Sequence, residues 1–236
     1  MARRLVQVNE GLLNHVHVAT LLQRCARERL SAQNIISLDT VCAILQREAM
    51  SVVGNKFSAK EVSSMIYSLR LFNEKTSGIE VYLQTVLRLL DSCTDPFNAQ
   101  NIACSFYGLQ NFSSEMIQIQ AMVSSLVKKI KATDEVNRRV QLLGDQEISM
   151  TLFGFRRMCF NPIINEAFHV LALRVDSHKP FESEQAVANS LNGFQNMDCS
   201  RPEQSGVNAM LRAIIPKIKK FRGPLSPRGA GSAYMV

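Results

Sequence analysis

Apolar residues recur along this chain at intervals of three and four positions. The pattern is clearest in four related segments of fourteen residues, whose sixth, tenth and thirteenth positions are apolar. Because this spacing puts the three side chains on one face of a helix, each segment predicts an amphipathic α-helix. The segments follow one another at spacings of 40, 46 and 39 residues. They are Phe57–Arg70, Phe97–Gln110, Leu143–Arg156 and Glu182–Gln195.

A second helical pattern follows each segment, and turn-forming residues separate the pairs that result. One of these second helices is expected to start at Asn161–Pro162, since proline suits the first helical position. An additional pair is predicted upstream, where Val18 and Leu22 align with the sixth and tenth positions of the first segment. The predicted pairs cover residues 14–54, 57–94, 97–133, 141–177 and 181–220.

These pairs predict an all-α fold. A single pair cannot bury its apolar face alone, so the predicted pairs are expected to stack on a shared core. The predicted architecture is an αα-repeat solenoid of about five helix pairs that occupies residues 1–221. Residues 222–236 contain Gly, Pro and Ser without periodicity, which predicts a disordered basic C-terminal tail.

The twelfth position of each segment holds a small residue. Glycine within a helical pattern costs about 1 kcal/mol relative to alanine. Since three of the four segments accept this cost, the position predicts either a close approach of a neighbouring helix or the end of the helix. The four residues are Ser68, Gly108, Gly154 and Gly193.

Charge is distributed unevenly along the 236 residues, which carry a formal net charge of +7. Six basic residues and no acidic one occur from Arg212 onward. Such an end favours a polyanion as partner, and the alternative is a terminus that only increases solubility. The candidate contacts to a polyanion in this region are Lys217, Lys219, Lys220, Arg222 and Arg228.

Several classes of function lack support in the residue pattern. No apolar run approaches the roughly 18 residues of a membrane span. The sequence has no glycine-rich phosphate loop, no nucleophile elbow and no Cys/His spacing typical of a metal site. We therefore expect a non-enzymatic protein without a cofactor, a metal, a small-molecule substrate or a membrane as partner.

The segment Phe97–Gln110, FNAQNIACSFYGLQ, resembles the first helix of octotricopeptide-type repeats and the related heptatricopeptide repeats of FAST-kinase-like and RAP-domain proteins. The resemblance covers roughly residues 57–220, and the first pair more weakly. It implies a helical-repeat protein of the mitochondrion, or alternatively the plastid, that is associated with organellar RNA.

The repeats are few and irregularly spaced, which favours a structural subunit of a large ribonucleoprotein over a reader of a long RNA. The expected partners are organellar RNA, for example ribosomal RNA in a mitochondrial ribosome, and the protein subunits of such a complex. Two alternatives stay open. One is a protein-binding scaffold without direct RNA contact, and the other is a dedicated organellar RNA-processing or stability factor.

Two positions of each segment lie opposite its apolar stripe and suggest RNA contacts. Amides and lysine at position four would contact base edges or phosphates, and rings at position eleven would stack on bases. Alternatively, the rings pack against the neighbouring repeat and the polar residues are solvated or cap helices. Position four holds Lys60, Gln100, Gln146 and Gln185, and position eleven holds Tyr67, Tyr107, Phe153 and Asn192.

Position fourteen provides a second candidate row. Together with Arg157, these residues predict an edge that contacts phosphates. The alternative is a set of residues at helix ends that bind backbone carbonyls and interact with the helix dipole. The row consists of Arg70, Gln110, Arg156 and Gln195.

Overall fold

The computed structural model describes residues 14–27, 37–51, 57–137, 140–197 and 205–223. These residues form ten α-helices and one 3₁₀-helix, η2 (Leu69–Leu71), and within them there is no strand beyond an isolated bridge between Leu143 and Val175. The all-α class predicted from the hydrophobic periodicity is confirmed. The predicted C-terminal tail lies, from residue 224 onward, outside the described residues.

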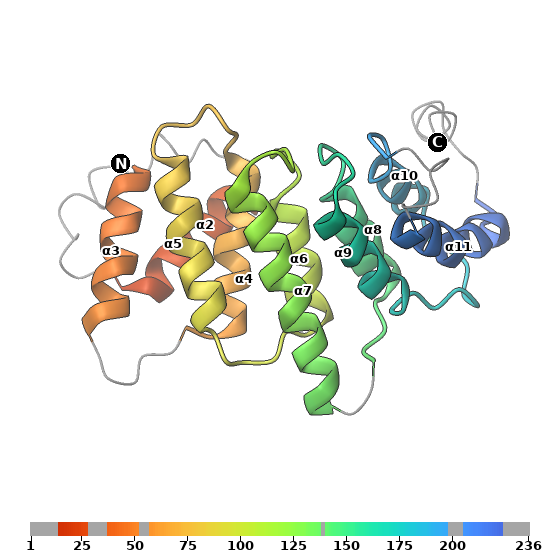
Figure 1. Cartoon of the computed structure of the whole chain (residues 1–236), viewed down its shortest axis with the longest axis horizontal. Coiled ribbons are helices and arrows are strands. Elements are labelled where there is room, and N and C mark those ends of the chain that lie inside the picture. Colours follow the sequence, from red (N-terminus) through yellow and green to blue (C-terminus); the bar gives the residue numbers. More distant parts are fainter. Residues whose placement is uncertain (1–13, 28–36, 52–56, 138–139, 198–204, 224–236) are drawn as a thin grey trace.

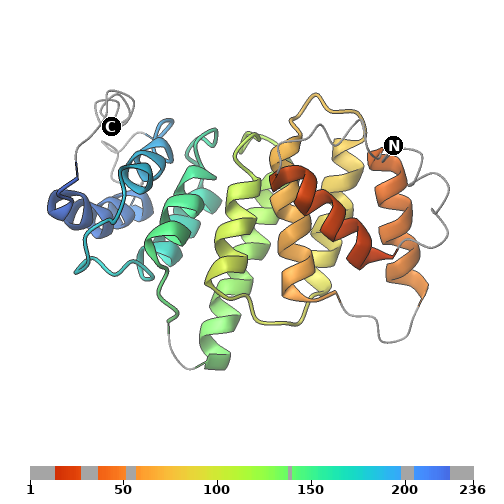
Figure 2. The same cartoon turned by 180° about the vertical axis from the view of Figure 1, so that it is seen from behind.

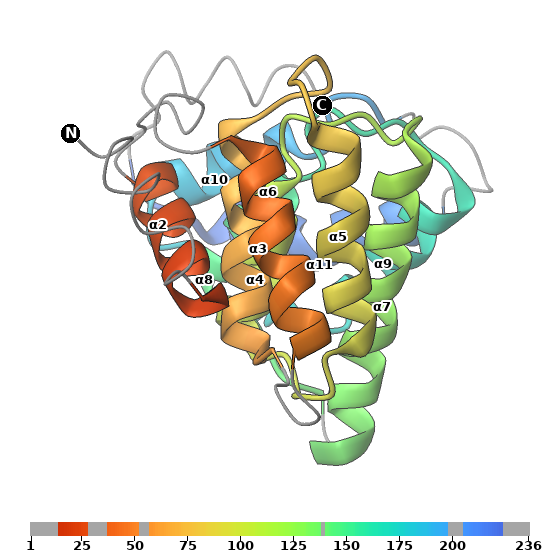
Figure 3. The same ribbon diagram turned by 90° about the vertical axis from the view of Figure 1, so that its left-hand side faces the viewer.

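The helices form two layers, each in chain order (Figures 1 and 3). The first layer faces the viewer in Figure 2 and contains the helices predicted from the four segments and the upstream alignment. Its members are α2 (His15–Arg27), α4 (Ala59–Ser68), α6 (Ala99–Gly108), α8 (Asp145–Phe153) and α10 (Glu184–Asn192). The second layer consists of α3 (Leu38–Ser51), α5 (Ile79–Ser92), α7 (Ile117–Asn137), α9 (Pro162–Ala172) and α11 (Ser205–Lys220).

Side-chain caps start several of these helices at the residues that the sequence leads one to expect. The Asn161 side chain accepts a hydrogen bond of 2.9 Å from the Ile164 amide, and Pro162 occupies the first helical position, as predicted. Ser58, Asn98 and Ser183 cap α4, α6 and α10 in the same way. Capping by such side chains satisfies amides that have no partner within the helix.

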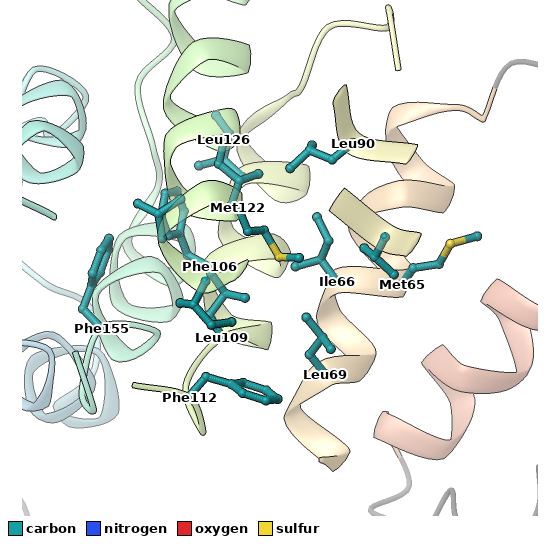
Figure 4. Close-up of a cluster of buried hydrophobic side chains, with 14 of the residues drawn as sticks. Met65, Ile66, Leu69, Leu90, Phe106, Leu109, Phe112, Met122, Leu126 and Phe155 are labelled. Atoms are coloured by element: carbon teal, nitrogen blue, oxygen red, sulfur yellow. The ribbon is translucent and has the colours of Figure 1, made fainter. Parts of the chain in front are cut away.

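The apolar stripe of each segment forms the core between the layers. All twelve residues at positions six, ten and thirteen are buried. Figure 4 shows Ile66, Leu69, Phe106 and Leu109 from the first layer beside Met122 of α7. A chain of rings continues the core through the later pairs, with centroid separations of 5.1, 4.7 and 5.4 Å between successive rings. These rings belong to Phe106, Phe155, Phe168 and Phe194.

The glycines at position twelve lie against the backbone of the preceding first-layer helix. A Cβ atom on Gly108 would overlap the carbonyl oxygen of Ile66 in α4. The same holds for Gly154 against Phe106 and for Gly193 against Leu152. The backbone at these glycines has no positive φ, so the requirement is space and not an unusual conformation. Of the two explanations predicted for position twelve, close approach is therefore confirmed, and the glycines also lie at the ends of their helices.

We expect Gly108→Ala to lower the free energy of unfolding by about 2–3 kcal/mol, because the added methyl must push α4 and α6 apart. Gly144→Ala is the control, since its Cβ would meet only the movable carboxylate of Glu147. Urea unfolding followed by circular dichroism measures both variants. Equal stability of Gly108→Ala and the parent protein would contradict the close approach.

Candidate nucleic-acid interface

The exposed side of the first layer is hollowed along α4, α6, α8 and α10. One hollow of about 370 Å³ is lined by Gln100, Cys104 and Gln146, together with Gln23 of α2. A second of about 600 Å³ is lined by Arg70, Tyr107, Gln146 and Gln185. The two hollows share Tyr67, Gln146 and Met150, so they form one continuous depression, which we call the amide groove.

The groove brings positions four and eleven of the segments together on one face, as predicted. Gln100, Gln146 and Gln185 are exposed, one from each of three successive first-layer helices. Lys60 is also exposed at the equivalent position of α4. The Gln185 amide donates a hydrogen bond of 2.7 Å to Asn189, while no hydrogen bond within the described residues engages the side chains of Gln100 and Gln146. Two amides are therefore free to bind a ligand that enters the groove.

Several groove residues were not candidates from the sequence, among them Cys104, Met150 and Gln23. Cys104 and Met150 stand at position eight, and Gln23 is the α2 counterpart of position eleven. Positions four, eight and eleven have the i, i+4, i+7 spacing of one helix face, so the same wheel that suggested the outer two positions implies the middle one. Gln23 could have been found by extending the alignment to the upstream pair.

The rings at position eleven form a row in which each ring faces the next. Tyr67 and Tyr107 stack with their centroids 6.0 Å apart, and Tyr107 and Phe153 stack at 5.6 Å. A base inserted between two rings would need about 7 Å, twice the ordinary contact distance between carbon atoms. The inner ring faces are therefore closed to bases, and packing against the neighbouring repeat accounts for this row. In α10 position eleven holds Asn192, so the row of rings ends at Phe153 of α8.

Arg70 is fixed at the edge of this row. Its guanidinium lies over the rings of Tyr67 and Tyr107, 5.1 and 5.3 Å from their centroids, and donates a hydrogen bond of 2.6 Å to the Tyr67 hydroxyl. Burial raises the pKa of Tyr67 despite the adjacent cation, so this hydroxyl stays neutral. Within the described residues no carboxylate forms an ion pair with Arg70. An oriented positive charge therefore faces the larger hollow.

Two other members of the position-fourteen row bind backbone carbonyls, and Arg156 thereby ties its repeat to the preceding one. Gln110 is buried, and its side chain donates to the Tyr107 carbonyl. The Arg156 side chain donates to the Gln110 carbonyl at 3.1 Å and to the Asn111 side chain at 2.9 Å, and it lies over the Phe153 ring. The predicted phosphate edge is corrected for Gln110 and Arg156, because their polar groups already satisfy helix ends.

Two residues of the predicted edge stay accessible. Arg157 is exposed, although its guanidinium donates to the Asn111 carbonyl at 3.2 Å. Gln195 is exposed, and its neighbour Asn196 makes the inter-repeat bond by donating to the Arg156 carbonyl. These two side chains lie at the ends of α8 and α10 and do not line the amide groove.

Lys217 does not belong to the basic surface that the sequence predicts. Its side chain is 1 % exposed, and its ammonium bonds to Asp145 at 2.9 Å and to the carbonyls of Asp176 and Lys179. An ammonium that is buried and fully bonded cannot reach a phosphate, so this prediction is corrected. Lys219, Lys220 and Arg222 are exposed, and Arg228 lies outside the described residues.

Acidic residues limit what the groove can bind. Glu147 lines the smaller hollow, and Asp145 and Glu182 line the larger one. Against three carboxylates the groove holds one cation, Arg70, and one of the carboxylates, Asp145, is paired with Lys217. The groove is therefore weakly acidic, and it suits a ligand held by amide hydrogen bonds better than a string of phosphates. In the described part of the chain no cluster of His, Cys, Asp and Glu could hold a metal ion.

Comparison with known proteins found no match that could assign a function to the amide groove. No protein-family model, curated protein or solved structure matches the chain. Among the described helices none has the length and apolar character needed to cross a membrane.

We expect Asp145→Asn to lower the free energy of unfolding by about 3 kcal/mol, because it leaves the Lys217 charge buried without a counterion. Lys217→Met should cost less, since the Asp145 side chain is 17 % exposed and can be hydrated. Urea unfolding of the two variants tests this order. A larger loss in Lys217→Met would contradict the assignment of Lys217 as the buried member of the pair.

Proposed function

We propose that this protein is a non-catalytic RNA-associated helical-repeat protein whose five helix pairs stack as an α-solenoid. Its proposed role is that of a structural subunit in an organellar ribonucleoprotein, such as the mitochondrial ribosome. The resemblance of Phe97–Gln110 to octotricopeptide-type repeats supports the RNA partner and the organelle. The order of the helices in two layers supports the solenoid.

One observation supports RNA binding most strongly: two successive helix pairs each place a free amide in a groove that also holds Arg70, which has no ion pair within the described residues. Gln100 and Gln146 can both donate to and accept from the edges of unpaired bases. Arg70, positioned by two rings and the Tyr67 hydroxyl, retains donors that can bind a phosphate. Single-stranded RNA supplies base edges and phosphates together, which is why we favour it as the ligand.

A protein-binding scaffold is the second candidate function, and the acidic residues of the groove favour it. Glu147 and Glu182 would repel phosphates but attract a basic peptide. The amides would then bind peptide carbonyls and amides in place of bases. The two candidates differ in whether RNA binds the isolated protein.

We expect Gln100→Ala/Gln146→Ala to weaken binding of a fluorescent 20-nucleotide RNA of mixed sequence by about 10- to 30-fold, since each lost hydrogen bond contributes about 1 kcal/mol. Arg70→Gln should weaken it to a similar extent. The controls are Gln46→Ala/Gln84→Ala and Arg88→Gln, at exposed positions of α3 and α5 in the second layer. Fluorescence anisotropy gives the Kd values. If groove and control variants bind RNA equally well, the groove is not the RNA site.

The proposed assembly is tested by isolating the tagged protein from mitochondrial extract with and without ribonuclease. Ribosomal RNA and ribosomal proteins that co-migrate with it would support the structural subunit. Specific messenger or precursor transcripts would instead indicate an RNA-processing factor. A ribonuclease-resistant complex without RNA would overturn the RNA proposal and leave the scaffold.

A further inference from the structure

Helix α11 carries a basic stripe on its exposed side. Arg212, Ile215 and Lys219 are exposed and lie at i, i+3 and i+7, which places them on one helix face. Arg222 is exposed directly after the helix end. We infer that this stripe, defined by Arg212, Lys219 and Arg222, is a second RNA-binding surface that holds phosphates. This surface is separate from the amide groove, and the inference rests on the proposed RNA association.

The position of α11 leaves this side of the helix uncovered by other described helices. It is the last member of the second layer and packs against α9 (Figure 1, blue). Its opposite side buries Val207, Met210 and Ile214 in the core. Because the apolar side faces inward, the basic side faces outward at the end of the array.

Lys220 adds a positive charge at this end of the array, whereas Lys179 and Asp176 offset each other. Lys220 donates a hydrogen bond of 3.0 Å to the His178 carbonyl, which places the loop between α9 and α10 beside the end of α11. Lys179 in that loop is 80 % exposed. No acidic residue occurs within α11. Of the acids nearby, Asp145 is neutralised by the buried Lys217, and Asp176 is 4.0 Å from Lys179.

The burial of Lys217 distinguishes it from the exposed basic residues of the stripe, which the sequence alone does not do. Of the six basic residues from Arg212 onward, Lys217 is buried and pairs with the partly exposed Asp145, whereas the stripe residues have no ion pair within the described part of the chain. Two of these cations lie on one side of α11 and the third lies just past its end. Such a row suits the phosphates of a nucleic acid strand, and binding them releases condensed counterions.

A lipid surface fits the stripe less well. An interfacial helix presents its apolar face to the bilayer and keeps its charges toward water. Helix α11 has already buried its apolar face against α9, and Ile215, at 40 % exposure, is its one strongly exposed apolar side chain. RNA is therefore the partner that the charge and the packing favour.

The two surfaces should differ in their dependence on salt. Contacts through neutral amides release few counterions, so within the groove only Arg70 contributes to the salt dependence of binding. Each phosphate contact on a single strand contributes about 0.7 to the slope of log Kobs against log salt concentration. Removing the three stripe cations should therefore reduce that slope by about 2.

The test measures binding of the same 20-nucleotide RNA by anisotropy over a series of KCl concentrations. We expect Arg212→Gln/Lys219→Gln/Arg222→Gln to lower the slope by about 2, and Gln100→Ala/Gln146→Ala to weaken binding at unchanged slope. The matched control, Lys75→Gln/Arg88→Gln/Lys128→Gln, removes the same charge from exposed positions elsewhere and should keep the parent slope. Circular dichroism melting verifies that each variant is folded.

Three results would overturn the inference. An unchanged slope in the stripe variant would remove the surface from the RNA site, and the proposed function would still stand if the groove variant binds weakly. An equal decrease of the salt-dependence slope in the control variant would show that net charge alone causes the change. Loss of binding to phosphatidylserine vesicles with unchanged RNA binding would make the stripe a membrane contact. Failure of the parent protein to bind RNA would overturn the proposed function itself.

Discussion

The contact between a glycine and the backbone of the preceding helix is the constraint on which the first layer depends. Gly108, Gly154 and Gly193 each lie where a Cβ would overlap a carbonyl oxygen of the neighbouring helix. Helices held this close bring the aromatic side chains at their exposed side into contact, which closes the ring row to bases. The same spacing aligns Gln100 with Gln146 along one groove. Local packing thus decides which groups are available for binding.

In the second layer Gly206 of α11 likewise lies against the Asn165 carbonyl of α9, and buried or partly buried cations add further links between successive helices. Lys129, Arg174 and Lys217 each follow a buried aliphatic residue by three positions, at equivalent places in α7, just after α9, and in α11. Each bonds to groups at or after the end of the preceding second-layer helix: Lys129 to carbonyls after α5, Arg174 to Asp134, and Lys217 to the loop after α9. Cations suit helix C-termini because of the helix dipole. Burial lowers the pKa of Arg174 to about 10, so it remains charged near neutral pH.

The proposed function follows from the polar groups that these structural demands leave free. Gln110 and Arg156 satisfy helix ends, and the buried Lys217 pairs with the Asp145 carboxylate. What remains on the surface divides into a weakly acidic groove lined by amides and a basic stripe at the end of the array. A ligand that uses both must present hydrogen-bonding edges and phosphates, and RNA presents both.

The sequence by itself determined the all-α class, the order of the helices and the core, because a helix with one apolar stripe must bury it wherever it folds. It also placed Gln100, Gln146 and Gln185 on one exposed face, since that follows from helical periodicity alone. Only the tertiary structure decided that Tyr67 and Tyr107 face each other and that Lys217 points into the core. Those outcomes depend on the distance between helices and on partners about 40 to 70 residues away, which no local pattern encodes.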